Sequence, residues 1–138
     1  MTLSAKSFLY AHDPETGIVE ITLNRPEARN SVNSALGQAL VSTVKRLDED
    51  DGLSIGILTG AGKGFSAGMD LKAFATEGPP KGFSEFLTQG STKPLIAAVE
   101  GFALAGGLEI ALACDLRIGV RETKYGPVFT RLGLIPDG

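Results

Sequence analysis

The stretch GFALAGGLEIALACD, residues 101–115, decides the fold because a glycine-rich turn in it leads directly into an apolar helix. The run from Gly106 to Ala113 is typical of a buried helix. Apolar segments typical of strands flank it at Leu95–Val99 and Leu116–Val120. Strand, helix and strand in succession predict an α/β layer arrangement.

The same alternation extends toward the N-terminus. Phe8–His12 and Gly17–Asn24 are rich in apolar and β-branched residues, and the turn between them predicts a hairpin. A helix with apolar residues three and four apart, a short strand, and a weakly helical segment broken by Gly78-Pro79-Pro80 are expected at Asn33–Leu47, Ile55–Gly60 and Phe74–Thr88. The 138 residues suffice for one domain or part of one.

Composition excludes several classes of protein. Lys and Arg total 13 against 16 Asp and Glu, a net charge of −3, which argues against binding to nucleic acid. The single cysteine, Cys114, forms no internal disulfide and no metal cluster, so we expect a reducing compartment. The sequence begins with no secretory signal pattern and has no apolar run of membrane-spanning length, which predicts a cytoplasmic protein without a membrane partner.

Two glycine motifs fail as sites of known type. Gly64-Phe65-Ser66-Ala67-Gly68 matches the G-x-S-x-G turn of serine hydrolases, but there the catalytic histidine follows the serine, and the only histidine, His12, precedes it. The run Gly60–Gly64 begins like a phosphate-binding loop, yet Gly64 stands where Ser or Thr should follow Lys63. Neither a serine hydrolase nor a nucleotide-binding loop is supported.

Two turns and two acids remain as candidates for chemistry. Ser66–Asp70 and Leu104–Leu108 are either ordinary tight turns or loops whose backbone N–H groups bind a carbonyl oxygen. Glu109 either complements the dipole at the start of its helix or acts as a general acid or base in apolar surroundings. Asp137 lies between Pro136 and Gly138, a composition that also suits a plain turn.

Three ordered motifs resemble the enoyl-CoA hydratase/isomerase (crotonase) superfamily. They are ITLNRPEARNSVN (21–33), GFSAGMDLK (64–72) and GFALAGGLE (101–109), with ACD at 113–115. The resemblance implies a spiral of β-β-α turns, of which residues 1–138 form the N-terminal part, truncated before the C-terminal helices. It also implies a homo-oligomer, a trimer or a dimer of trimers.

The resemblance further implies a binding site for an acyl-CoA substrate. The backbone N–H groups of Ala67 and Gly106 match the pair that holds the thioester oxygen and stabilises an enolate. The residues matched to acyl-CoA contacts are Glu27, Ala28, Arg29, Ala67, Gly68, Met69, Asp70 and Leu71. No metal or other cofactor is implied, and CoA enters only as part of the substrate.

The acid and base positions indicate the reaction. Glu109 matches one of the two glutamates of hydratases, whereas Phe129, which cannot transfer a proton, stands in place of the other. Family isomerases instead carry an acid where Asp137 stands. We therefore expect isomerisation of an enoyl-CoA double bond, with Asp137 as proton shuttle and Glu109 as its partner or alternative base. The alternatives are a hydratase with altered acid and base groups and a non-catalytic acyl-CoA-binding protein.

Overall fold

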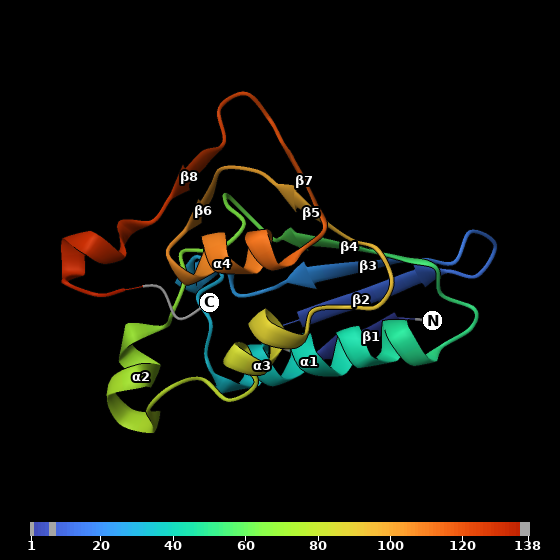
Figure 1. Ribbon diagram of the computed structural model, residues 1–138, viewed down its shortest axis with the longest axis horizontal. Coiled ribbons are helices and arrows are strands. Elements are labelled where there is room, and N and C mark those ends of the chain that lie inside the picture. The colour runs from blue at the N-terminus through green and yellow to red at the C-terminus, as the bar shows by residue number, and fades with distance from the viewer. Residues whose placement is uncertain (1, 6–7, 136–138) are drawn as a thin grey trace.

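A computed structural model describes residues 2–5 and 8–135 as a layered arrangement of strands and helices (Figure 1). The strands are β1 (Thr2–Ala5), β2 (Phe8–Asp13), β3 (Ile18–Leu23), β4 (Ile55–Gly60), β5 (Leu95–Val99), β6 (Phe102–Leu104), β7 (Leu116–Gly119) and β8 (Lys124–Gly126). The helices are α1 (Ser34–Glu49), α2 (Leu71–Glu77), α3 (Phe83–Gln89) and α4 (Gly106–Ala113), with short 3-10 helices η1 (Pro26–Ala28) and η2 (Val128–Leu132).

The main sheet has six strands in the order β1-β2-β3-β4-β5-β7. The expected hairpin is confirmed, since β2 and β3 pair antiparallel and the Gly17 N–H closes the turn on the Asp13 carbonyl at 2.9 Å. From β3 onward the neighbouring strands are parallel. The short strands β6 and β8 form a separate parallel pair beside α4. The α/β class expected from the sequence is confirmed.

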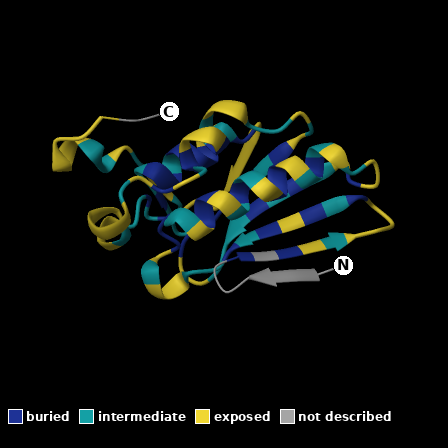
Figure 2. Ribbon diagram, turned by 90° about the horizontal axis from the view of Figure 1, so that it is seen from below, coloured by how far each residue is buried: buried dark blue, intermediate teal, exposed yellow. Residues whose placement is uncertain are grey.

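Helix α1 covers one face of the main sheet. The helix expected at Asn33–Leu47 is confirmed and ends two residues later, at Glu49. The side chain of Asn33 caps its start by accepting the Leu36 N–H at 3.0 Å. Buried residues recur along α1 with helical spacing (Figure 2), at Leu36, Leu40, Val44 and Leu47. Helix α3 packs beside α1, and together they enclose the core against β3, β4 and β5.

The edge of the sheet at β7 is exposed. Leu116 and Ile118 on β7 are 58% and 63% exposed, and Leu112 on the neighbouring α4 is 59% exposed. Such apolar edges are normally covered by further structure. Among the described residues, no helix combines the length and the apolar character needed to cross a bilayer.

We predict that Cys114 resists thiol reagents in the folded protein. Burial raises the pKa of its thiol to about 12, and the side chain is only 3% exposed at the end of α4. Because the thiolate is the reactive form, alkylation at pH 8 should be at least about a hundredfold slower than for a free thiol. Mass spectrometry after iodoacetamide treatment measures this, with urea-unfolded protein as the control. Equal labelling of folded and unfolded protein would contradict the prediction.

Candidate active site

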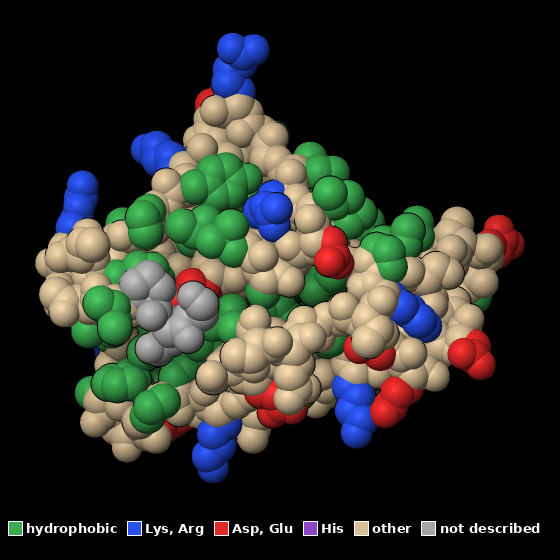
Figure 3. All heavy atoms as spheres, in the orientation of Figure 1, with side chains coloured by type: hydrophobic (Ala, Val, Ile, Leu, Met, Phe, Trp, Pro, Cys, Tyr) green, Lys and Arg blue, Asp and Glu red, His purple; other side chains and the backbone are tan. Residues whose placement is uncertain are grey.

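An apolar cavity of about 330 Å³ lies between α2, α3, α4 and η2. Figure 3 shows hydrophobic side chains gathered on the side of the molecule where α2, α4 and η2 lie. The residues that line the cavity are Ala67, Met69, Leu71, Phe74, Phe83, Ala105, Gly106, Glu109, Val128, Phe129, Leu132, Leu134 and Ile135. Among the described residues that line the cavity, Glu109 alone has a charged side chain. This cavity therefore combines an apolar binding surface with a single acid.

The loop before α2 places one backbone N–H toward the cavity. The Val32 N–H donates to the Gly68 carbonyl at 2.7 Å, and the Asp70 N–H donates to the Val32 carbonyl at 2.9 Å. In a trans peptide the C=O and the N–H point in opposite directions, so the N–H of Met69 points away from Val32. Within the described part of the chain this N–H has no acceptor.

The N–H group of Ala67, the donor expected from the sequence, is already bonded. The Ala67 N–H already donates to the Arg29 carbonyl at 3.0 Å, so it is not free to bind a ligand. Ala67 still lines the cavity, together with the expected contact residues Met69 and Leu71. The sequence motif gives no sign that the Ala67 N–H is bonded, because its partner Arg29 comes from a distant segment.

The second donor begins α4. Gly106 is the first residue of that helix, where N–H groups have no partner within the helix, and in the described structure its N–H meets no acceptor. A Cβ placed on Gly68, which has φ +98°, would lie 2.8 Å from the Gly106 nitrogen, and one on Gly106 would lie 3.5 Å from the Met69 nitrogen. The two unpaired N–H groups therefore lie side by side, an arrangement suited to one carbonyl oxygen.

Helix α4 also carries the acid. Glu109 lies one turn beyond Gly106, is 8% exposed and lines the same cavity. Both interpretations left open by the sequence are compatible with this position, since the residue is in the first turn of the helix and also faces the cavity. Phe129 on η2 lines the cavity as well. The other expected acid, Asp137, lies outside the described residues.

The expected contacts around η1 belong to a second cavity. Glu27 and Arg29 line a hollow of about 560 Å³, together with Lys63 from the glycine-rich loop. The bond from the Ala67 N–H to the Arg29 carbonyl joins the walls of the two cavities. The glycine-rich loop fits no nucleotide-binding pattern, so the sequence gives no reason to expect Lys63 beside Glu27 and Arg29.

Asp70 stabilises the loop that carries Met69 and does not line the apolar cavity. Its carboxylate caps α2 by accepting the N–H groups of Lys72 and Ala73, each at 3.1 Å, and it pairs with Arg25 at 2.9 Å. Arg25 also donates to the Ser31 carbonyl at 2.6 Å. This pair fastens the η1 segment to the loop that carries Met69.

Asp70 should make stability depend on pH. Hydrogen bonds from the Ala73 backbone N–H and from Arg25 hold the pKa of the Asp70 carboxyl below its ordinary value. The ionised group thus stabilises the fold above about pH 4, and this stabilisation is lost as pH falls through the folded-state pKa. Asp70→Asn should lower the free energy of unfolding by about 1 kcal/mol at pH 7 and by less at pH 3.

Urea unfolding at the two pH values measures this difference. The exposed Asp51 provides the matched control, because Asp51→Asn should change the free energy of unfolding little at either pH. A loss for Asp70→Asn that is equal at pH 7 and pH 3 would show that the charge of Asp70 contributes nothing.

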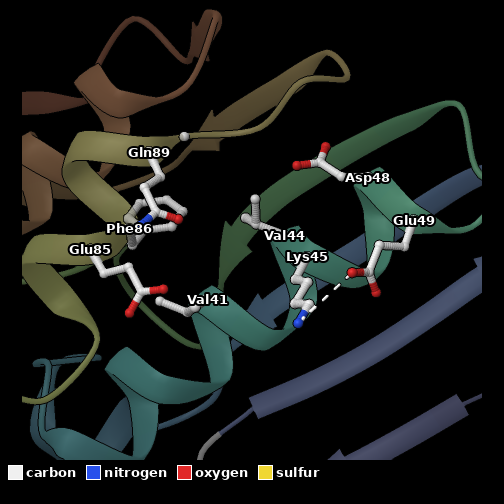
Figure 4. Close-up of a pocket in the computed structure, with 9 residues that line it drawn as sticks. Val41, Val44, Lys45, Asp48, Glu49, Glu85, Phe86 and Gln89 are labelled. Atoms are coloured by element: carbon white, nitrogen blue, oxygen red, sulfur yellow. Dashed lines mark ion pairs between the residues drawn. The ribbon is translucent and has the colours of Figure 1, made fainter.

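A third hollow, of about 360 Å³, lies between α1 and α3 (Figure 4), and charged side chains of α1 in its lining already have partners. Lys45 pairs with Glu49 at 3.8 Å. Asp48 accepts hydrogen bonds from the Ser91 hydroxyl at 2.7 Å and the Thr92 N–H at 2.9 Å. The described residues contain no group of three or more His, Cys, Asp or Glu placed to hold a metal ion.

Comparisons with known proteins identify the family of the chain. The family model described as Enoyl-CoA hydratase/isomerase matches residues 13–138. A probable enoyl-CoA hydratase of Mycobacterium bovis is 37% identical over 140 residues, covering 97% of this chain and 54% of its own length. The 1,2-epoxyphenylacetyl-CoA isomerase of Escherichia coli is also 37% identical, over 142 residues, with 94% and 54% covered.

Solved structures with a similar fold carry the same family description. A probable enoyl-CoA hydratase/isomerase from Mycobacterium abscessus superimposes with a TM-score of 0.87 at 44% identity, covering 96% of this chain and 52% of that one. The enoyl-CoA hydratase EchA1 from Mycobacterium marinum gives 0.84 at 50% identity, with 95% and 52% covered. The chain spans about half the length of the relatives it matches. It belongs to the enoyl-CoA hydratase/isomerase family.

Proposed function

We propose that the apolar cavity binds the acyl part of an enoyl-CoA thioester and that the protein shifts its double bond through an enolate. The observation that carries this proposal is a pair of N–H groups, on Met69 and Gly106, that have no acceptor among the described residues and share one cavity with the buried Glu109. Donors of this kind stabilise the negative charge that develops on a thioester oxygen when a neighbouring carbon loses its proton.

The proposed reaction needs two proton transfers and no water. A carboxylate removes a proton from a carbon next to the double bond, and the electron pair moves into the conjugated system, where the enolate oxygen is held by the two N–H groups. A proton is then returned at the other end of that system, so that the double bond moves and the composition stays the same. Asp137 is the proposed shuttle, with Glu109 as its partner or as the alternative base.

Isomerisation is favoured over hydration by the residues around Glu109. Phe129 lines the cavity where a second carboxylate would be needed to activate water. The remaining lining side chains are apolar, which keeps water away from an enolate. The relatives include hydratases and an isomerase, so the similarity alone does not decide between the two reactions.

A product assay in H₂¹⁸O tests the proposal. A 3-enoyl-CoA should be converted to a 2-enoyl-CoA of unchanged mass. In a parallel assay with a 2-enoyl-CoA as substrate, formation of a hydroxyacyl-CoA that carries ¹⁸O, without isomerisation of the 3-enoyl-CoA, would replace the isomerase with the hydratase. Binding of the thioester without turnover would favour a non-catalytic acyl-CoA-binding protein.

The other parts of the binding site are proposed on the same basis. We place the nucleotide part of CoA along Glu27, Ala28 and Arg29, beside the cavity that also contains Lys63. CoA is then part of the substrate, with no separate cofactor. Assembly as a trimer or a dimer of trimers, and a cytoplasmic location, stay predictions that analytical ultracentrifugation and cell fractionation would check.

A further inference from the structure

Ser66 has a hydroxyl group that the proposed reaction does not use. The residue is fully buried, at 0% exposed, in the Gly64–Gly68 motif that resembles a serine hydrolase. Its Oγ donates to the Asn30 carbonyl at 2.8 Å and accepts the Gly68 N–H at 3.2 Å. A hydroxyl group held by two backbone partners in this way is not available as a nucleophile, but it can fix the geometry of the loop.

The acceptor of the Ser66 hydroxyl is itself held rigidly. The side chain of Asn30 donates to the carbonyls of Ala61 and Gly64, each at 2.8 Å, and accepts the Arg25 N–H at 2.8 Å. Asn30 is 1% exposed. Ser66 is therefore tied to a fixed point of the fold and not to a mobile surface loop.

The backbone of Ser66 contacts the segment that leads to the second donor. Its N–H donates to the Phe102 carbonyl at 3.2 Å, and its carbonyl accepts the Leu104 N–H at 3.0 Å, so it pairs with β6. A Cβ on Gly107, the second residue of α4, would overlap the Ser66 carbonyl oxygen. Ser66 thus packs directly between the loop that carries Met69 and the helix that begins with Gly106.

The peptide planes on both sides of Gly68 are fixed by different partners. The plane before Gly68 is held by the Ser66 hydroxyl through the Gly68 N–H. The plane after it contains the Met69 N–H and is held by Val32 through the Gly68 carbonyl. Glycine at φ +98° has little intrinsic preference for this conformation, so both anchors are needed to fix the direction of the Met69 N–H.

We propose that Ser66 is a positioning residue, which acts through Gly68 to direct the Met69 N–H at the thioester oxygen. This inference rests on the proposed function. It gives the serine of the motif a role in aligning a hydrogen-bond donor.

The variant Ser66→Ala tests the inference because it removes both hydrogen bonds of the hydroxyl group and adds no bulk. Turnover should fall by about tenfold to a hundredfold, since donors displaced by a fraction of an ångström bind the transition state less well. KM should change less than threefold, because the apolar walls of the cavity are unchanged. In infrared spectra of a bound saturated acyl-CoA with a ¹³C-labelled carbonyl, the variant should show a smaller shift of the carbonyl stretch to low frequency.

Ser42→Ala is the matched control. The Ser42 hydroxyl also bonds a backbone carbonyl, that of Gln38 at 2.9 Å, but on α1, outside the cavity lining. Turnover and the carbonyl frequency should therefore stay at wild-type values. If Ser66→Ala does not fold, Ser66→Cys keeps a weak donor and acceptor and should give an intermediate carbonyl shift.

The outcomes separate failure of the inference from failure of the proposed function. A wild-type carbonyl shift that persists fully in folded Ser66→Ala or Ser66→Cys would overturn the positioning role alone. An equal loss of turnover and of folded protein, with a normal carbonyl shift, would reduce Ser66 to a purely structural residue. A wild-type protein that binds the thioester with no carbonyl shift would overturn the proposed function, and the inference with it.

Discussion

Glu109→Gln should lower the rate of isomerisation by about 10²–10⁴-fold with little change in KM. Glutamine has nearly the same shape as glutamate but cannot transfer a proton, and positioned acid–base groups contribute factors of this size. Glu109 is 8% exposed and lines the same apolar cavity as the two N–H donors, so its carboxylate has little contact with bulk water. Steady-state kinetics with a 3-enoyl-CoA measure the loss.

A comparison of two variants assigns the proton transfers. The exposed Glu122 serves as the control, since Glu122→Gln should leave turnover unchanged. If Asp137→Asn also lowers turnover strongly, the two acids share the transfer as proposed. If Asp137→Asn has no effect while Glu109→Gln abolishes turnover, Asp137 is not the shuttle. Full activity of Glu109→Gln would remove Glu109 from the mechanism.

Gly106→Ala should lower turnover by about 10²–10³-fold, the range expected for loss of one donor to a developing oxyanion. The added Cβ would lie 3.5 Å from the Met69 nitrogen and 3.1 Å from the Phe83 ring. The methyl group would therefore compete for the space in which the thioester oxygen must approach both N–H groups. The helix itself should tolerate alanine, which has a higher helix propensity than glycine.

The measurement pairs kinetics with thermal unfolding. Gly52→Ala, in an exposed turn outside the cavity lining, is the matched control and should keep wild-type turnover. Gly106→Ala should lose turnover while its unfolding temperature stays close to that of the control. Wild-type turnover of Gly106→Ala would show that the oxygen binds elsewhere.

Elements with a local signal could be predicted from the sequence. The hairpin of β2 and β3, the helix α1 and the strands β4 and β5 each carry their periodicity within one continuous segment. The break at Gly78-Pro79-Pro80 also appears, since two short helices, α2 and α3, replace one. The strands β6 and β8 were missed because each has three residues and is formed only by pairing with the other, across α4 and β7.

In the candidate site, too, some features have a local sequence signal and others depend on distant partners. Glu109 could be proposed because it is the charged residue in the first turn of an apolar helix, and Gly106 could be proposed from the resemblance to the family. Which N–H group of the loop before α2 is left unbonded among the described residues could not be identified. It depends on Arg29, which occupies the Ala67 N–H, and on Val32, which orients the Met69 N–H. Both partners come from another segment, so no pattern within the loop distinguishes the two candidates.

The spacing of Gly106 and Glu109 on α4 determines the regiochemistry of the proposed reaction. Three residues of helix correspond to about 4.5 Å along its axis. A thioester oxygen held at Gly106 therefore presents the carbons next to the carbonyl group to Glu109, whatever the length of the acyl tail beyond them. Acyl chains of different length should therefore be deprotonated at the same carbon, counted from the thioester. The helix fixes the distance between the group that binds the thioester oxygen and Glu109, and this distance does not depend on the acyl tail.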